Sequence, residues 1–345
     1  MPALSAPAKV LVTGANGFVG VWIVKTLLEA GYAIRGTVRT PSKGEHLKTF
    51  FAGKGDFEVV IVDDITKEGA FDQAVQGVDL VVHSASPFHF KAIVPDDLIV
   101  PAVKGTVGIL ESVKKFGTSV KRIVITGSCA SVFKPSNKPE IFDETSWNEP
   151  AIKEVKEKGA AAPVPIMYRA SKMLAEQAAW EFYEKNKSSI PWDLVVLLPP
   201  FVSTPPIQDV PSLNELNQSM QDLYDSVVLG KRGDAALLQG FAWVDVRDLA
   251  VAHKLALETE GAKGERIIIS SGPYFWQTLV DVANSITPAP LPNLAKGKPE
   301  LIKGKPFPLD YSTAKMTRIF GFKPRGLEEM MRDSLEQFAR IKAKA

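Results

Sequence analysis

The stretch "KVLVTGANGFVG", residues 9–20, decides the fold. An apolar run typical of a buried strand leads into Gly14, Gly17 and Gly20, and a helical pattern follows. Gly14 and Gly17 allow a tight turn whose backbone approaches a pyrophosphate, which then binds the free amides of the helix amino terminus. Gly20 allows close packing of helix on strand. The alternative is a plain tight turn with a packing glycine, but the flanking strand and helix favour dinucleotide binding.

Short apolar runs and helical patterns alternate along the rest of the chain. Runs rich in Val, Ile and Leu predict strands at 9–14, 33–39, 57–64, 78–85, 120–128, 192–199 and 264–270. Continuous apolar strands separated by helices are typical of a parallel sheet covered on both faces. The sequence therefore predicts an α/β fold, a doubly wound parallel (Rossmann) sheet with a smaller C-terminal substrate-binding lobe.

The chain divides into two expected units. Residues 1–200, with 241–271 returning to the sheet, are expected to form the dinucleotide-binding domain. The less regular residues 201–240 and 272–345 are expected to form the substrate-binding lobe. This division places a substrate pocket at the carboxyl ends of the strands, beneath the second lobe.

Composition excludes several classes of function. Lys and Arg number 41 against 39 Asp and Glu, a net charge of +2 without a basic tract, so no nucleic-acid or membrane partner is expected. The single cysteine, Cys129, excludes an internal disulfide and fits a reducing compartment, which favours a cytoplasmic protein. No signal-peptide pattern and no membrane-length apolar run is present in the sequence. His83 and His89 are too few and too isolated to predict a metal site.

The end of the second predicted strand indicates which dinucleotide binds. A site for NAD usually has an acid there that holds the ribose 2′-hydroxyl, whereas "GTVRTPSKG" offers Arg39 and Lys43. A guanidinium and an ammonium suit a 2′-phosphate, so NADPH is the expected cofactor; a solvated loop with two ordinary cations is the alternative. After the third strand, Asp64 and Ile65 are placed to accept from the adenine amine and to pack on its ring, and Asp63 is equally readable as a loop acid.

Tyr168 and Lys172, in "YRASK", lie four residues apart at the start of a long helical pattern. Residues at this spacing share a helix face, and a nearby ammonium lowers the pKa of a phenol from about 10 toward the working range. Ser128, at the end of the fifth strand, can donate to a carbonyl oxygen on which charge develops. Each residue alone has an ordinary structural explanation; the order of glycine turn, Ser128 and Tyr-x-x-x-Lys favours a hydride-transfer site.

Aromatic residues follow three of the predicted strands. Phe88, Phe133 and Phe201 come after the fourth, fifth and sixth strands, where a pocket wall is expected. Trp147 and Trp243 are further candidates for this wall, but for them core packing is favoured over substrate contact. Because no Arg or Lys is obviously placed for a carboxylate or phosphate, we expect the substrate to be an apolar or aromatic ketone or aldehyde.

The whole chain resembles an extended short-chain dehydrogenase/reductase. Within that group it is similar to the fungal aldehyde, ketone and methylglyoxal reductases, relatives of plant dihydroflavonol 4-reductase and cinnamoyl-CoA reductase. The motifs that carry the resemblance include "VTGANGFVG", "VVHSASPF", "RIVITGSCASV" and "SKMLAEQAAWEF". The resemblance implies a Ser128–Tyr168–Lys172 triad and NADPH contacts from Gly14, Gly17, Phe18, Val19, Arg39, Lys43, Asp64, Ile65, Ala85, Ser86, Tyr168, Lys172, Pro199 and Val202.

The chain also departs from that pattern. "LLPPFVSTPP" has Leu198 and Thr204 where Asn before Pro and Gly before Pro are common, and Lys104 takes the place of a helix asparagine that serves in proton relay. Ser131 is a weaker match than Ser128 to the catalytic serine. These departures leave the conformation of the loop and the relay to Tyr168 open.

The resulting interpretation is an NADPH-dependent carbonyl reductase that acts on a small ketone or aldehyde as a monomer or homodimer. A sugar-nucleotide epimerase or hydroxysteroid-type dehydrogenase on the same fold is the enzymatic alternative. A non-catalytic NADP(H) sensor is the alternative from another class, and such proteins usually lose the Tyr–Lys pair that this chain keeps.

Overall fold

Within residues 4–86 and 92–344, which the computed structural model describes, seven parallel strands form the central sheet. Their order is β10-β7-β5-β4-β1-β2-β3, so the direction of winding reverses between β1 and β4. This is the predicted doubly wound sheet, and such a reversal opens a crevice for ligands at the carboxyl ends of the strands. The strands are β1 (Lys9–Thr13), β2 (Ala33–Val38), β3 (Phe57–Ile61), β4 (Leu80–His83), β5 (Arg122–Thr126), β7 (Asp193–Leu198) and β10 (Arg266–Ile268).

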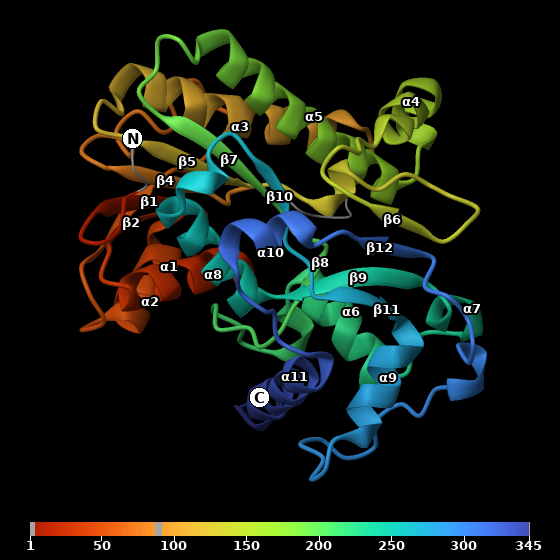
Figure 1. Ribbon diagram of the computed structural model, residues 1–345. Helices are drawn as coiled ribbons and strands as arrows, with labels where there is room; N and C mark the ends of the chain where they lie inside the picture. The colour runs from red at the N-terminus through yellow and green to blue at the C-terminus, as the bar shows by residue number, and fades with distance from the viewer. Residues whose placement is uncertain (1–3, 87–91, 345) are drawn as a thin grey trace.

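Helices cover both faces of this sheet, as Figure 1 shows. One face carries α1 (Phe18–Glu29), α2 (Pro41–Phe51) and α8 (Val246–Glu258). The other carries α3 (Asp96–Phe116) and α5 (Val164–Asn186), with α4 (Glu149–Lys158) beside α5. Each face has its own cluster of fully buried Val, Leu and Ile side chains, which explains why the strands are apolar on both sides.

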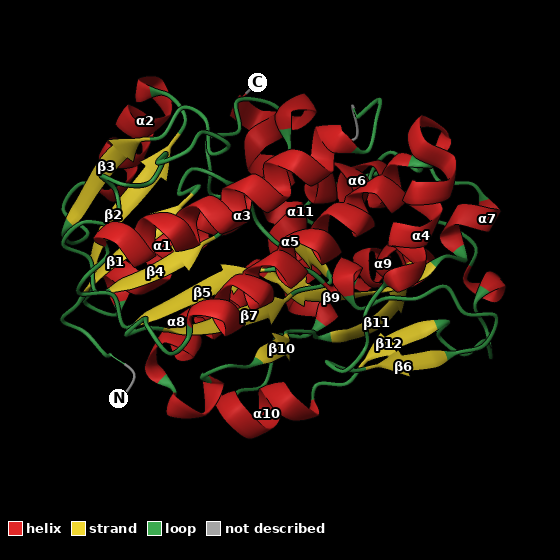
Figure 2. Cartoon of the chain, turned by 90° about the horizontal axis from the view of Figure 1, so that it is seen from above, coloured by secondary structure: helices red, strands yellow, loops and turns green. Residues whose placement is uncertain are grey.

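The smaller lobe has a core of its own. Strands β11 (Gly272–Phe275), β9 (Gly240–Asp245) and β8 (Phe201–Ser203) form a second sheet over α6 (Gln218–Val227), α9 (Trp276–Ser285) and α11 (Leu327–Lys344). A further pair joins β12 (Leu309–Tyr311) to β6 (Glu140–Phe142). Figure 2 shows both small sheets at the end of the molecule opposite β3 and α2. The remaining elements are α7 (Asp234–Leu237), α10 (Ala314–Phe320) and the short 3₁₀ turns η1 (Cys129–Ser131), η2 (Gly159–Ala161), η3 (Leu213–Glu215), η4 (Glu260–Ala262) and η5 (Pro299–Leu301).

One segment divides between the two lobes. The sequence predicts that 241–271 returns to the central sheet, and α8 and β10 do lie on it. Strand β9 instead pairs with β8 and β11. The reason is aromatic packing, because Trp243 on β9 and Tyr274 on β11 are buried in the core of the smaller lobe.

Candidate active site

The glycine turn adopts a conformation that side chains at its glycine positions would prevent. Gly14 has a φ of +68°, which favours glycine, and a Cβ at Gly20 would lie 2.2 Å from the carbonyl oxygen of Gly14. Gly17 is the N-cap of α1 and, as a glycine, has no side chain with which to cap the helix amides. The turn therefore leaves the positive end of α1 free and approachable, as a pyrophosphate requires.

The ends of β1 and β4 meet at the reversal of strand order. A Cβ on Gly14 would lie 3.0 Å from Cα of Ala85, so these two predicted cofactor residues are in close contact. Thr13 Oγ1 accepts from the amides of Ser84 and Ala85, both at 3.1 Å, which leaves its proton for Nδ1 of His83 at 2.9 Å. Burial lowers the pKa of His83 to about 3, with the charge of Lys172 acting in the same direction, so His83 is neutral. This network fixes the backbone that leads to Ser86.

Arg39 and Lys43, the cations predicted for the adenosine end, each lie near an acid from another loop. Arg39 and Lys43 are exposed, and Lys43 is the third residue of α2. The pKa of Asp64 is lowered by hydrogen bonds from Thr66 and also by the nearby charges of Lys67 and Arg39. Lys43 Nζ lies 3.2 Å from a carboxylate oxygen of Asp209, in the loop after β8. Lys43 thus joins α2 to the loop after β8, and Arg39 lies near the loop after β3.

Asp63 and Ile65, which flank Asp64 in the loop after β3, have different surroundings from each other. Asp63 pairs with Lys67 at 2.6 Å, which makes it an ordinary loop acid. Ile65 packs on α3, where a Cβ at Gly105 would lie 2.8 Å from Cδ1 of Ile65. Ile65 is half-buried, and its contact with an adenine ring stays a prediction.

Ser128 and Tyr168 are brought together by β5 and α5. Ser128 is 9% exposed, and its Oγ accepts from the amide of Ala130 at 3.1 Å. Burial raises the pKa of Tyr168 to about 12, while a hydrogen bond with the side chain of Ser128 acts against that rise. The lowered tyrosine pKa that the sequence predicts is therefore not found in this arrangement, where desolvation is the larger effect.

Lys172 shares the face of α5 with Tyr168. Its Nζ lies 6.0 Å from the centroid of the Tyr168 ring and donates to Oγ of Ser86 at 3.0 Å. Burial lowers the pKa of Lys172 to about 8. The ammonium thus stands between the proposed acid and the end of β4, two sites that the sequence predicts separately.

The loop after β7 has an unusual backbone conformation at Thr204, one of the positions where its sequence departs from the family pattern. Thr204 has a φ of +117°, in the region that favours glycine, and its Oγ1 is buried without a hydrogen-bond partner among the described residues. Pro199 is buried, and its carbonyl accepts from the amide of Cys129 at 2.9 Å. Val202 is half-buried in β8. The loop is therefore tied to the Ser128 turn, beside the predicted nicotinamide position.

The predicted aromatic wall is only partly visible. Phe133 is half-buried, with the guanidinium of Arg169 4.6 Å from its ring centroid. Phe201 packs on Tyr274 and Trp276 at centroid distances of 6.1 and 5.4 Å, in the core of the smaller lobe. Phe88 lies outside the described residues. Pocket roles for these three phenylalanines remain predictions.

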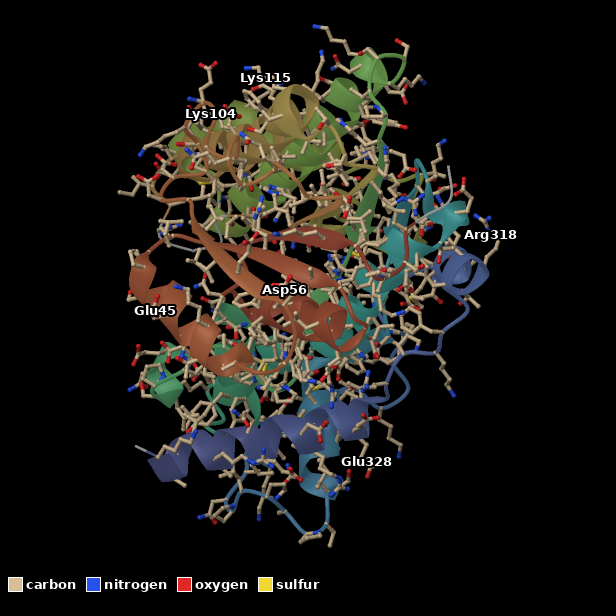
Figure 3. The ribbon with its side chains drawn as sticks, turned by 90° about the vertical axis from the view of Figure 1, so that its left-hand side faces the viewer. Glu45, Asp56, Lys104, Lys115, Arg318 and Glu328 are labelled. Atoms are coloured by element: carbon tan, nitrogen blue, oxygen red, sulfur yellow. The ribbon has the colours of Figure 1, made fainter. Side chains whose placement is uncertain are left out.

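Three residues with expected or open roles lie elsewhere. Lys104 is exposed on the outer side of α3, as Figure 3 shows, so it does not substitute for a relay asparagine facing the site. The 3.6 Å distance of the Arg266 guanidinium from the Trp147 ring centroid agrees with packing, as does the burial of Trp243.

Sequence reasoning missed the buried partner of Ser131. The hydroxyl of Ser131 bonds to the carboxylate of Glu176, which is 4% exposed and lies on α5 one turn after Lys172. The available signal was an acid four residues beyond Lys172, on the same helix face. Ser131 is thus engaged away from Tyr168, and Ser128 is the serine at the site.

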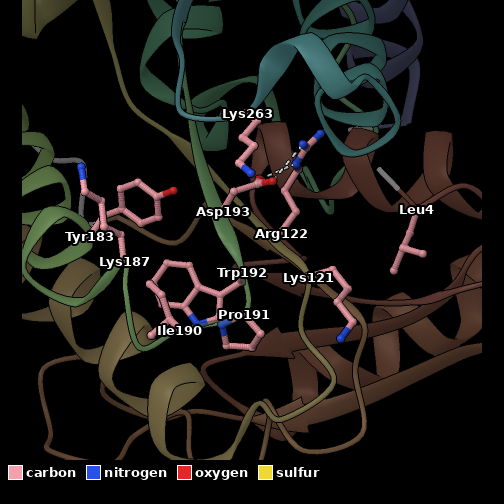
Figure 4. Close-up of a pocket in the computed structure, with 10 residues that line it drawn as sticks. All are labelled: Leu4, Lys121, Arg122, Tyr183, Lys187, Ile190, Pro191, Trp192, Asp193 and Lys263. Atoms are coloured by element: carbon pink, nitrogen blue, oxygen red, sulfur yellow. Dashed lines mark hydrogen bonds and ion pairs between the residues drawn. The ribbon is translucent and has the colours of Figure 1, made fainter. Parts of the chain in front are cut away.

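A separate cavity of about 130 Å³ lies at the opposite edge of the central sheet, at the starts of β5 and β7 (Figure 4). Arg122 holds Asp193 there with two hydrogen bonds, of 2.6 and 3.0 Å. Ligands of doubly wound sheets bind at the carboxyl ends of the strands, so this cavity is not the candidate site.

In the portion of the chain that is described, no cluster of three or more His, Cys, Asp or Glu side chains is placed to hold a metal. Over the same portion, no helix is long and apolar enough to cross a membrane.

Comparison with known proteins agrees with this geometry. The model of the NAD dependent epimerase/dehydratase family matches residues 10–270. The chain is 38% identical to the ketoreductase azaE of Aspergillus niger, with 96% of this chain and 97% of the relative covered. It is 34% identical to the NADPH-dependent methylglyoxal reductase GRE2 of Saccharomyces cerevisiae, with 97% and 99% covered.

Solved structures show the same likeness. The yeast methylglyoxal/isovaleraldehyde reductase Gre2 complexed with NADPH superimposes with a TM-score of 0.84 at 33% identity, covering 98% of this chain and all of that chain. Gre2 of Candida albicans, also in complex with NADPH, gives 0.86 at 32% identity, with 97% and 99% covered. The expected resemblance is confirmed: the chain belongs to the NAD dependent epimerase/dehydratase family, among the extended short-chain dehydrogenases/reductases.

Proposed function

We propose that the protein is an NADPH-dependent reductase of small ketones or aldehydes. The observation that carries this proposal is the hydrogen bond between Ser128 and Tyr168, with Lys172 on the same helix face. The site lies where β1 and β4 end beside a glycine turn, the position at which this fold binds dinucleotides. Relatives similar along nearly the whole chain are named as carbonyl reductases, which supports the same reaction.

The described residues fit the cofactor. The glycine N-cap of α1 and the contact of Gly14 with Ala85 support pyrophosphate binding at this turn, and the Lys172–Ser86 hydrogen bond supports a role for both residues at the ribose on the nicotinamide side. Arg39 and Lys43 supply the cations for a 2′-phosphate. Further contacts are proposed for Gly17, Phe18, Val19, Asp64, Ile65, Pro199 and Val202. NADPH, when bound, supplies the hydride that reduces the carbonyl carbon.

Protein side chains bind the carbonyl oxygen of the substrate and supply its proton. Ser128 and Tyr168 donate hydrogen bonds to the carbonyl oxygen, and their pull increases as negative charge develops there. Tyr168 then gives its proton to this oxygen. With a pKa of about 12, Tyr168 is protonated at neutral pH, and an alkoxide is a much stronger base than a phenolate, so transfer is downhill. The ammonium of Lys172 favours the phenolate left behind.

The substrate is proposed to be a small carbonyl compound. Phe88, Phe133 and Phe201 remain the proposed wall residues, and the half-buried Phe133, five residues after Ser128, is the best supported of them. The expected substrate is an apolar or aromatic ketone or aldehyde. We also propose a cytoplasmic protein, monomeric or homodimeric, for which the single buried cysteine is the supporting observation.

The decisive experiment follows loss of NADPH absorbance with a panel of ketones and aldehydes. The wild type should reduce several of them, and Tyr168→Phe should lose at least about a hundredfold in kcat with NADPH affinity retained. Equal activity of Tyr168→Phe would refute the mechanism. Failure of the wild type with every carbonyl, despite NADPH binding, would refute the function in favour of a sensor.

A further inference from the structure

Helix α5 carries a second charged residue, Glu176, on the face that holds Tyr168 and Lys172. Successive positions four residues apart rotate by about 40°, so Glu176 lies on the same stripe as Tyr168 and Lys172. Its side chain is only 2% exposed. A carboxylate this deeply buried needs partners, because desolvation strongly disfavours an uncompensated charge.

Arg266 of β10 provides the compensating charge. Arg266 Nε donates to Glu176 Oε1 at 2.8 Å and Nη2 donates to Oε2 at 3.2 Å, a bidentate pair. Nη1 donates to the carbonyl oxygens of Glu144 and Ser146 at 2.7 and 3.0 Å. The guanidinium is thereby held by β10, α5 and the segment before α4, which leaves Glu176 little freedom to move.

Ser131 connects this ion pair to the Ser128 turn. Its hydroxyl has one proton and faces two acceptors, Oε2 of Glu176 and the carbonyl oxygen of Ser128. The charged carboxylate is the stronger acceptor, and the Ser128 carbonyl is already bonded by the Ser131 amide at 3.0 Å. From the other side, the Ser131 carbonyl accepts from the amide of Asn148 at 2.8 Å. Glu176 is thus the tie between α5 and the turn that presents Ser128.

We propose that Glu176, acting through Ser131, is a positioning residue for the carbonyl reduction. Ser128 and Tyr168 come from different elements, a strand end and a helix, yet both must meet one oxygen atom. Glu176 joins those elements one helical turn beyond Lys172, so the separation of the two donors is set by α5 itself. A displacement of about 1 Å at a reacting centre can cost roughly a hundredfold in rate. This inference rests on the proposed reductase function.

The central test is Ser131→Ala, which removes the tie and leaves the Glu176–Arg266 ion pair intact. We expect kcat to fall about tenfold, with KM and the Kd for NADPH within twofold of wild type. Glu176→Gln should lower kcat at least as far. In the double variant the fall should equal that of Glu176→Gln alone, because both changes break one connection. Glu181→Gln, at an exposed position of the same helix, is the matched control and should match wild type.

Amide hydrogen exchange provides a second readout that does not need turnover. Exchange at residues 128–131 should quicken in Ser131→Ala, and not in Glu181→Gln. An unchanged kcat and unchanged exchange in Ser131→Ala would overturn the proposal, as would effects of the two single changes that multiply in the double variant. A wild type that binds NADPH but reduces no carbonyl would refute the function, while the exchange data would still show whether the tie holds the turn.

Discussion

Lys172 donates from Nζ to Oγ of Ser86 at 3.0 Å, which joins helix α5 to the end of β4. Both residues are predicted to contact the cofactor, and Ser86 is the acceptor that keeps the half-buried ammonium in place. Ser86→Ala removes the acceptor that keeps Lys172 in place for the cofactor. NADPH binding should weaken about tenfold, because a hydrogen bond to a charged group contributes about 1.5 kcal/mol or more. Titration by NADPH fluorescence measures this loss. A Kd equal to that of wild type would separate Ser86 from the cofactor site.

The pair of Lys43 and Asp209 gives a test of cofactor choice. Asp209 competes for Lys43 with any bound 2′-phosphate, since the two charges lie 3.2 Å apart. Asp209→Asn should therefore lower the KM for NADPH by several-fold and leave the KM for NADH unchanged. Arg39→Ala and Lys43→Ala should each raise the KM for NADPH about tenfold. If all three variants keep the wild-type ratio of NADPH to NADH efficiency, the phosphate assignment is wrong.

Gly20 is the most restrictive position of the glycine turn. A Cβ there would lie 2.2 Å from a backbone oxygen, so Gly20→Ala must displace the turn or the start of α1. We expect loss of measurable NADPH binding in equilibrium dialysis. Gly261→Ala is the control, because a Cβ at Gly261 meets nothing within 4 Å. Full binding by Gly20→Ala would show that the turn does not hold the cofactor.

Thr204 holds a strained backbone and a buried hydroxyl without a partner in the described chain. Thr204→Gly should stabilise the protein by about 1 kcal/mol, since relief of strain outweighs the added flexibility of the unfolded chain. Thermal unfolding should show a rise in Tm of about 2 °C. Thr204→Ala keeps the Cβ and should gain less, so an equal gain would place the cost in the hydroxyl and not in the backbone.

Buried histidines should make the fold sensitive to acid. Burial lowers the pKa of His83 to about 3 and of His253 to about 4, from an ordinary value of 6.5. The unfolded chain therefore binds protons that the folded chain refuses, and stability that is complete above pH 6.5 falls toward pH 4. Each histidine contributes a slope of about 1.4 kcal/mol per pH unit. Urea unfolding at pH 7 and pH 5 measures this loss, and His253→Gln should reduce it; an unchanged slope would contradict the assignment.

Periodicity and glycine spacing were sufficient to predict the central sheet. The apolar runs correspond to β1, β2, β3, β4, β5, β7 and β10, because strands buried on both faces leave a signal that needs no alternation. The two strands of the small pair gave no such signal. β6 and β12 have three residues each, and their paired residues lie 169 positions apart in the sequence, so tertiary contact and not local preference decides them.

Within the candidate site, the residues that could be predicted were those marked by their order and spacing along the chain. Ser128, Tyr168 and Lys172 were chosen by order and spacing, and the fold brings them to one edge. The pKa of Tyr168 was not predictable, because burial depends on the whole surrounding structure and exceeds the effect of a neighbouring charge. The exposure of Lys104 was not predictable, because a match along the chain does not tell which side of α3 faces solvent.

Cys129 follows Ser128 directly, is 2% exposed and donates from Sγ to the carbonyl oxygen of Leu198 at 3.1 Å. Burial raises the pKa of this thiol well above its ordinary value, so the native thiol is nearly inert toward alkylating reagents. Because the chain has no other cysteine, every modified molecule reports one event, the opening of the turn beside the proposed catalytic serine. Cys129 is therefore a built-in probe of local opening, and the rate at which its thiol is labelled measures how often that turn opens.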